Sequence, residues 1–189
     1  MSEIIASSSV YDSDTYYLLN SSYPQITQSF ITPSSKYFLN KIEFACKKIG
    51  SPTGNMYVKL YSHSGTYGSS SLPTGDALES STVIDVSTIS TSENDKESIF
   101  SGTYELLSDT YYVISLEYSG GNLENNIRIF TNSFDGYYSG NMAVYNGSTW
   151  SFPNFGGESL DFSFYVYGTP SSPTISNISQ ISGIQSITF

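Results

Sequence analysis

Apolar and polar residues alternate along residues 39–49, 55–61, 111–117 and 161–167. A period of two is typical of β-strands, because successive side chains point to opposite faces of a sheet. One face then packs on a core while the other meets water, as is common in antiparallel sheets. The positions that this pattern turns toward the core are Ile42, Phe44, Cys46, Met56, Val58, Leu60, Tyr112, Ile114, Leu116, Phe162, Phe164 and Val166.

Weaker alternation predicts further strands at residues 26–31, 77–86, 96–100, 126–130 and 141–145. Segments rich in Gly, Pro, Asn and Ser predict turns or loops at residues 50–55, 65–75, 119–122, 135–136 and 146–147. Among them, Asn146-Gly147 is a pair favoured in two-residue hairpin turns. No segment shows sustained helical periodicity. Many short strands separated by turns predict an all-β fold, either a sandwich or a barrel.

The composition changes after Gly168. Two prolines in residues 169–173 predict an extended linker, because each proline disfavours helix in the residue before it. A period of three follows, which fits neither a strand nor an α-helix but would align the side chains of a polyproline-type segment. A β-branched strand buried on both sides is the alternative. The residues with this spacing are Ile175, Ile178, Ile181, Ile184 and Ile187.

The chain divides accordingly into three parts: an N-terminal arm with a first strand (1–25), a β-sandwich (26–168), and a linker with an Ile-rich extended tail (169–189). Exposed isoleucines in a free tail favour aggregation, so we expect another chain to cover them. The tail would add an extended segment to a neighbouring sheet edge or lie in an apolar groove. A homo-oligomer, with a trimer as one possibility, is the expected result.

Charge bears on the choice of partner. The 189 residues include 7 Lys and Arg against 17 Asp and Glu, so the formal net charge is −10. Nucleic-acid binding and adsorption to anionic membranes both need clustered positive charge, so we expect neither partner. Hydrophobic residues make up 38% and aromatic residues 15%, which is enough to build a core.

The chain has one cysteine, Cys46, and one histidine, His63. One cysteine forms no intrachain disulfide, and the pair supplies too few ligands for a structural zinc site. Cys46 lies at a core-facing position, where a thiol is usually inert. Because no nucleophile–base pair can be assembled, the sequence predicts that the protein is not an enzyme.

No stretch approaches the ~18 apolar residues of a membrane-spanning helix. Residues 1–6 lack the basic start and long apolar run of a signal peptide. Either the chain is made and used without secretion, which the retained Met1 favours, or a leader has already been removed.

Several short motifs within residues 28–168 resemble a family of jelly-roll domains. Members are virion and tail-associated proteins of bacterial and archaeal viruses, and surface-anchored "choice-of-anchor" proteins. The likeness is a pattern of strands and turns, so it is specific for fold and says little about activity. The matching segments are 28–30, 47–55, 58–61, 72–75, 112–116, 118–121, 146–147, Trp150 and 161–168.

The resemblance implies an antiparallel β-sandwich of jelly-roll type with an N-terminal arm and an extended C-terminal tail. It also implies a structural virion protein, exposed on the capsid or tail and anchored to other virion proteins through its terminal extensions. The expected location is then the virion, assembled in the host cytoplasm, with an extracellular or cell-surface location as the alternative. The alternative function is a lectin-like module that binds a carbohydrate or receptor. The family brings no catalytic residues.

A ligand site of this second kind would use aromatic platforms. Trp150, the one tryptophan, follows the predicted hairpin and lies beside Tyr145, so either ring could stack on a sugar. Loop residues Asp135 and Tyr137 are further candidates. The opposing interpretation is that Trp150 packs over the end of the sandwich.

Carboxylates near the two ends of the sandwich could hold a hard cation. Calcium takes about six to eight oxygen ligands, and Asp12 and Asp14 could approach Asp161 if the chain ends meet. Solvated acidic loops are the alternative. We therefore expect no cofactor other than a possible calcium ion.

Overall fold

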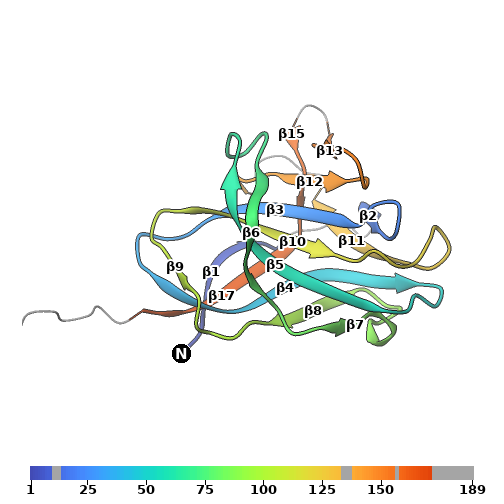
Figure 1. Ribbon diagram of the computed structural model, residues 1–189, viewed down its shortest axis with the longest axis horizontal. Coiled ribbons are helices and arrows are strands. Elements are labelled where there is room, and N and C mark those ends of the chain that lie inside the picture. Colours follow the sequence, from blue (N-terminus) through green and yellow to red (C-terminus); the bar gives the residue numbers. More distant parts are fainter. Residues whose placement is uncertain (10–13, 133–137, 156–157, 172–189) are drawn as a thin grey trace, which may run out of the picture.

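The architecture is known from a computed structural model, which describes residues 1–9, 14–132, 138–155 and 158–171. Two antiparallel β-sheets pack face to face, with the N-terminal strand β1 lying beside the late strand β17 (Figure 1). A separate two-stranded ribbon and one short 3-10 turn complete the described secondary structure. These are β14 (Asn154–Phe155), β15 (Glu158–Ser159) and η1 (Val86–Thr88).

Sheet I has eight strands in the order β1-β17-β4-β11-β16, with β2 against β11 and both β8 and β9 against β4. Its strands are β1 (Glu3–Ser8), β2 (Tyr16–Leu19), β4 (Tyr37–Ile49), β8 (Asn94–Ile99), β9 (Glu105–Leu106), β11 (Asn126–Asn132), β16 (Asp161–Phe162) and β17 (Phe164–Pro170).

Sheet II has seven strands in the order β13-β12-β3-β10-β5-β6, with β7 against β5. Its strands are β3 (Gln25–Ile31), β5 (Asn55–Ser64), β6 (Leu72–Ser80), β7 (Ile84–Asp85), β10 (Tyr111–Glu117), β12 (Met142–Tyr145) and β13 (Trp150–Ser151).

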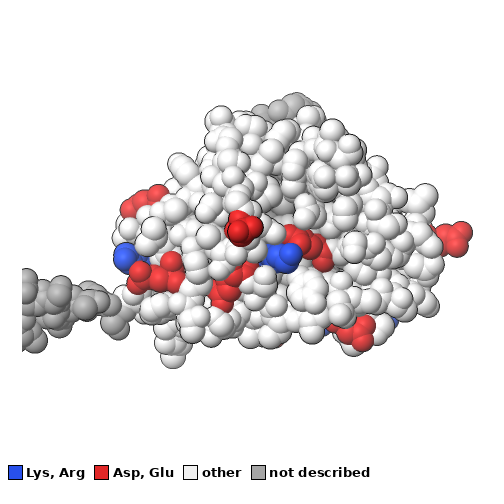
Figure 2. All heavy atoms as spheres, viewed as in Figure 1, with Lys and Arg blue, Asp and Glu red and all other residues white. Residues whose placement is uncertain are grey.

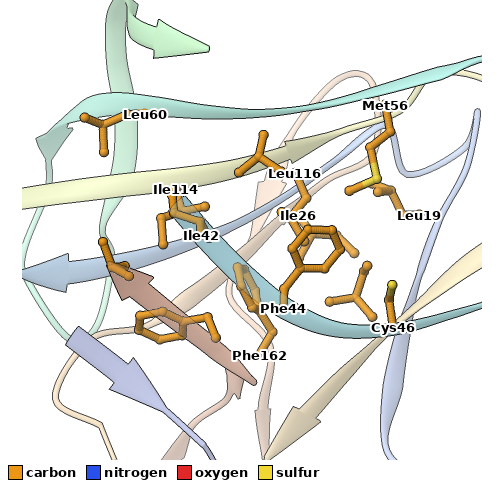
Figure 3. Close-up of a cluster of buried hydrophobic side chains, with 14 of the residues drawn as sticks. Leu19, Ile26, Ile42, Phe44, Cys46, Met56, Leu60, Ile114, Leu116 and Phe162 are labelled. Atoms are coloured by element: carbon orange, nitrogen blue, oxygen red, sulfur yellow. The ribbon is translucent and has the colours of Figure 1, made fainter. Parts of the chain in front are cut away.

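The core lies between the sheets and takes side chains from both. In Figure 3, Ile42 and Phe44 of sheet I meet Ile26 and Ile114 of sheet II. Every position that the alternation turned toward the core is buried; Tyr112 keeps 4% of its surface exposed and the others keep none. The predicted β-sandwich and its strand faces are therefore confirmed, whereas jelly-roll connectivity stays a prediction.

Residues 160–163 cross from one sheet to the other. The backbone N–H of Met142, in sheet II, donates to the carbonyl of Leu160 at 2.9 Å. The backbone N–H of Ala45, in sheet I, donates to the carbonyl of Ser163 at 3.2 Å. This short segment therefore joins the two sheets through main-chain hydrogen bonds.

The expected strand at 77–86 is wrong in its bounds. β6 begins at Leu72, inside the expected loop, and ends at Ser80. Pro73 fits there because β6 is an edge strand, where a missing N–H costs no ladder bond. The chain then turns at Ser81, whose buried hydroxyl accepts from the N–H of Val58.

The hairpin at Asn146-Gly147 forms, but its loop differs from the expected one. Tyr145 pairs with Trp150, so residues 146–149 connect the strands. The Oδ1 of Asn146 accepts from the N–H groups of Ser148 and Thr149, at 3.0 and 2.9 Å. Asn146 thus closes the loop with its side chain instead of occupying the centre of a two-residue turn.

The N-terminal residues contribute paired strands to sheet I. β1 pairs with β17, β2 pairs with β11, and Ile5 and Leu19 belong to the core. β17 runs to Pro170, past the expected start of the linker, because Thr169 and Pro170 still pair with β4. The isoleucine tail lies outside the described residues.

Candidate ligand-binding row

Five side chains from five strands of sheet II form one cross-strand row. Trp150 of β13 pairs with Tyr145 of β12, and Tyr145 pairs with Gln25 of β3. Gln25 pairs with Glu117 of β10, and Glu117 pairs with Tyr57 of β5. Directly opposed residues share a face, and strands about 4.8 Å apart make the row about 19 Å long. We call it the Trp150–Tyr57 row.

The row faces away from the core, because its sequence neighbours fill the core. Those neighbours are Val144, Ile26, Leu116 and Met56, which are all buried. Tyr57 is 38% exposed. The other members of the row, namely Gln25, Glu117, Tyr145 and Trp150, are half-buried.

A hollow of about 230 Å³ follows the row from Tyr145 to Tyr57. Its lining residues lie on or next to four neighbouring strands that span about 14 Å, and we call this hollow the trough. Aromatic rings stand at its two ends, with amide, carboxylate and hydroxyl groups between them. The described lining residues are Pro24, Gln25, Asn55, Tyr57, Glu117, Tyr118, Ser119 and Tyr145.

Two neighbours hold Glu117, which lies between Gln25 and Tyr57 in the row. Its Oε2 lies 2.6 Å from the Nζ of Lys59, and its Oε1 accepts from the hydroxyl of Tyr61 at 2.9 Å. Burial, and then the bond to Glu117, raises the pKa of Tyr61, which keeps that hydroxyl a donor. A carboxylate oxygen can accept more than one hydrogen bond, so Glu117 is oriented and still able to accept from a ligand.

One wall of the hollow depends on a glycine. The hydroxyl of Tyr118 donates to the carbonyl of Thr53 at 2.8 Å, which fixes its ring. A Cβ placed on Gly120 would lie 2.8 Å from the Tyr118 ring. The Gly120-Gly121 pair therefore lets the chain turn closely past the tyrosine.

The structure brings Tyr145 and Trp150 together. Their ring centroids are 5.0 Å apart and the rings are tilted by 38°. Trp150 is half-buried, so part of its surface remains open to a ligand. The other two residues expected at a ligand site, Asp135 and Tyr137, lie outside the described residues.

The expected calcium ligands are only partly described. Asp12 lies outside the described residues, and Asp14 is exposed. Asp161 is buried and accepts a hydrogen bond from Gln28. Among the described residues, no three His, Cys, Asp or Glu side chains gather as a metal site would require.

Cys46 and His63 occupy different sheets. Cys46 is buried in β4, and burial raises the pKa of its thiol to about 12. A thiol with such a pKa is protonated at neutral pH and weakly nucleophilic. The Nε2 of His63, in β5, lies 2.9 Å from the hydroxyl of Ser71.

A second hollow, of about 290 Å³, lies elsewhere in the described part of the chain. Its described lining residues are Tyr16, Tyr17, Leu18, Tyr23, Val144 and Ser151.

Sequence reasoning missed three members of the row: Gln25, Glu117 and Tyr57. The alternation indicated that Tyr57 and Glu117 face outward, and an exposed tyrosine on a strand is a sign of a binding face. Nothing in the sequence indicated that they lie in one cross-strand row with Tyr145.

Comparison with protein-family models finds no matching family, and comparison with curated proteins finds no similar sequence. The described part of the chain contains no helix with the length and apolar character needed to cross a membrane.

Proposed function

We propose that the protein is a non-catalytic binding module that recognises a saccharide through the Trp150–Tyr57 row. The observation behind this proposal is the order of groups along the row, with aromatic rings at both ends and hydrogen-bonding groups between them. The C–H face of a sugar ring packs on an aromatic face, as apolar groups generally do. Its hydroxyls both donate and accept, which suits the amides of Gln25 and Asn55 and the carboxylate of Glu117.

A glycan array probed with the purified protein tests this function. Tyr57→Ala and Trp150→Ala should each weaken binding by about ten-fold, since loss of one stacked ring costs about 1–1.5 kcal/mol. Tyr111→Ala is the matched control. Tyr111 is 42% exposed, on the same strand as Glu117 but six residues away, about 20 Å along β10.

Two results with these variants would contradict the proposal. One is saccharide binding that neither Tyr57→Ala nor Trp150→Ala weakens. The other is a loss of binding in Tyr111→Ala as large as in the two row variants. A proline-rich peptide that binds the row more tightly than any saccharide would also contradict it, because aromatic grooves can bind such peptides.

We also propose a setting for this module, from the family resemblance: a structural component of a bacterial or archaeal virus particle, exposed on the capsid or tail. In that setting the row would contact a host-surface glycan. Residues 172–189 would anchor the protein to other copies of the same chain or to other virion proteins. Mass spectrometry of purified virions should find the protein in a fixed stoichiometry; its absence would remove this setting while leaving the saccharide proposal intact.

A further inference from the structure

The two aromatic ends of the row are too far apart for one sugar ring. Tyr145 and Tyr57 are separated by three inter-strand spacings, about 14 Å. A monosaccharide, about the size of one aromatic ring, contacts one end only. A ligand that uses both ends must extend across the strands.

The trough also has the shape of a site for an extended chain. Its volume of about 230 Å³ is spread over four strands. The hollow is smaller than the roughly 300–1,000 Å³ of pockets that bury a compact ligand, and its lining residues lie on or next to strands β12, β3, β10 and β5. Contacts are therefore spread along the ligand and are not concentrated at one terminus.

Charge restricts the ligand further. Of the described residues that line the trough, Glu117 is the charged one, and Lys59 lies against it. Figure 2 shows that charged groups are sparse on the face it draws, where they form a few small clusters. With a formal net charge of −10, the protein repels an anionic chain at long range.

We infer that the ligand is a neutral, linear oligosaccharide that lies perpendicular to the strands and contacts Tyr57 and the Tyr145–Trp150 pair at once. This inference rests on the proposed saccharide-binding function. Between the two ends, ligand hydroxyls donate to Glu117 and exchange hydrogen bonds with the amide of Gln25. Lys59 and Tyr61 already hold the Glu117 side chain in place, so this side chain loses less conformational entropy when the ligand binds.

The test is the dependence of affinity on ligand length. The probes are the monosaccharide, trisaccharide and hexasaccharide of the neutral sugar with the highest array signal, with a hyaluronan hexasaccharide as the anionic comparison. Affinities are measured by titration calorimetry for the wild type, Tyr57→Ala and Tyr111→Ala. Thermal unfolding of each variant confirms that it is folded.

The hexasaccharide should bind at least about ten-fold more tightly than the monosaccharide. Tyr57→Ala should remove about ten-fold of hexasaccharide affinity and leave monosaccharide affinity unchanged, because one ring occupies the Tyr145–Trp150 end. Tyr111→Ala should change neither.

Equal affinity for all lengths would overturn the inference and leave the saccharide-binding function standing. So would equal weakening of the monosaccharide and the hexasaccharide by Tyr57→Ala, or tighter binding of hyaluronan. If no saccharide binds, the proposed function itself fails, and the inference fails with it.

Discussion

Gln28 of β3 donates a hydrogen bond from Nε2 to Oδ1 of Asp161 in β16, across the two sheets, at 2.5 Å. The Oε1 of the same amide accepts from the N–H of Phe162 at 3.1 Å. Gln28 is fully buried and Asp161 is 5% exposed. One amide therefore holds the segment that joins the sheets, at the point where a carboxyl group is buried.

This burial makes stability depend on pH. Desolvation raises the pKa of Asp161 from 3.8 to about 7, and the bond from Gln28 offsets only part of that effect. Because the folded pKa is raised, the stabilisation is complete below pH 3.8 and is lost as the pH rises to about 7. At about 1.4 kcal/mol per unit, the total is on the order of 4 kcal/mol.

Asp161→Asn should remove this dependence, since the amide stays neutral and still accepts from Gln28. Urea unfolding at several pH values should show the variant gaining stability relative to the wild type as the pH rises from about 4 to about 7. Tyr67 and Tyr138, which face Asp161, stay neutral in this range because burial raises the pKa of each hydroxyl.

His63 contributes a pH dependence of stability with the opposite sign. Burial lowers the pKa of His63, so its contribution to stability grows as the pH rises. His63 is present in both proteins, so its contribution cancels when the free energy of unfolding of the wild type is subtracted from that of Asp161→Asn. If this difference in free energy of unfolding does not change between about pH 4 and pH 7, Asp161 is ionised in the folded protein and the prediction is wrong.

Phe164→Ala should lower the free energy of unfolding by about 3–5 kcal/mol. Phe164 is fully buried and packs edge-on against Tyr138 and Phe162, with ring centroids 5.2 and 5.8 Å away. Tyr165→Ala, on the outer face of the same strand, is the control and should lower the free energy of unfolding by less than Phe164→Ala does. Equal losses in urea unfolding would show that the inner face of β17 is not part of a packed core.

Trp150 is the one tryptophan, so its fluorescence reports on one end of the row. Addition of a saccharide that binds should change its emission. Trp150→Phe should abolish the signal yet keep affinity within about three-fold, because phenylalanine still stacks. An unchanged emission spectrum at saturating saccharide would show that the ligand does not reach the Tyr145–Trp150 end.

A chain that ends at Ser171 should stay folded with similar thermal unfolding. The chain is cut after Ser171 because Ser171 still binds the sandwich. Its N–H donates to the carbonyl of Lys36, and its hydroxyl donates to Oε1 of Glu105 at 2.6 Å. If residues 172–189 mediate assembly, the shortened chain should lose oligomerisation, measured by light scattering. Loss of folding would instead assign the tail to the sandwich itself.

Part of the candidate site follows from local sequence. Tyr145 and Trp150 lie together because a short hairpin joins their strands, and a hairpin needs only residues close in the chain. Asp161 shows the limit of such reasoning. It alternates with the core residue Phe162, which predicts an outward carboxylate, yet the segment crosses between sheets and turns Asp161 toward Gln28.

The sequence by itself determined which face of each strand is apolar, because that depends on a period of two within a few residues. Only the tertiary structure decided that Tyr57 and Glu117 join Gln25 and Tyr145 in one row. Their alignment depends on the register between strands far apart in the chain, and the register is set by the pairing and packing of the whole sandwich.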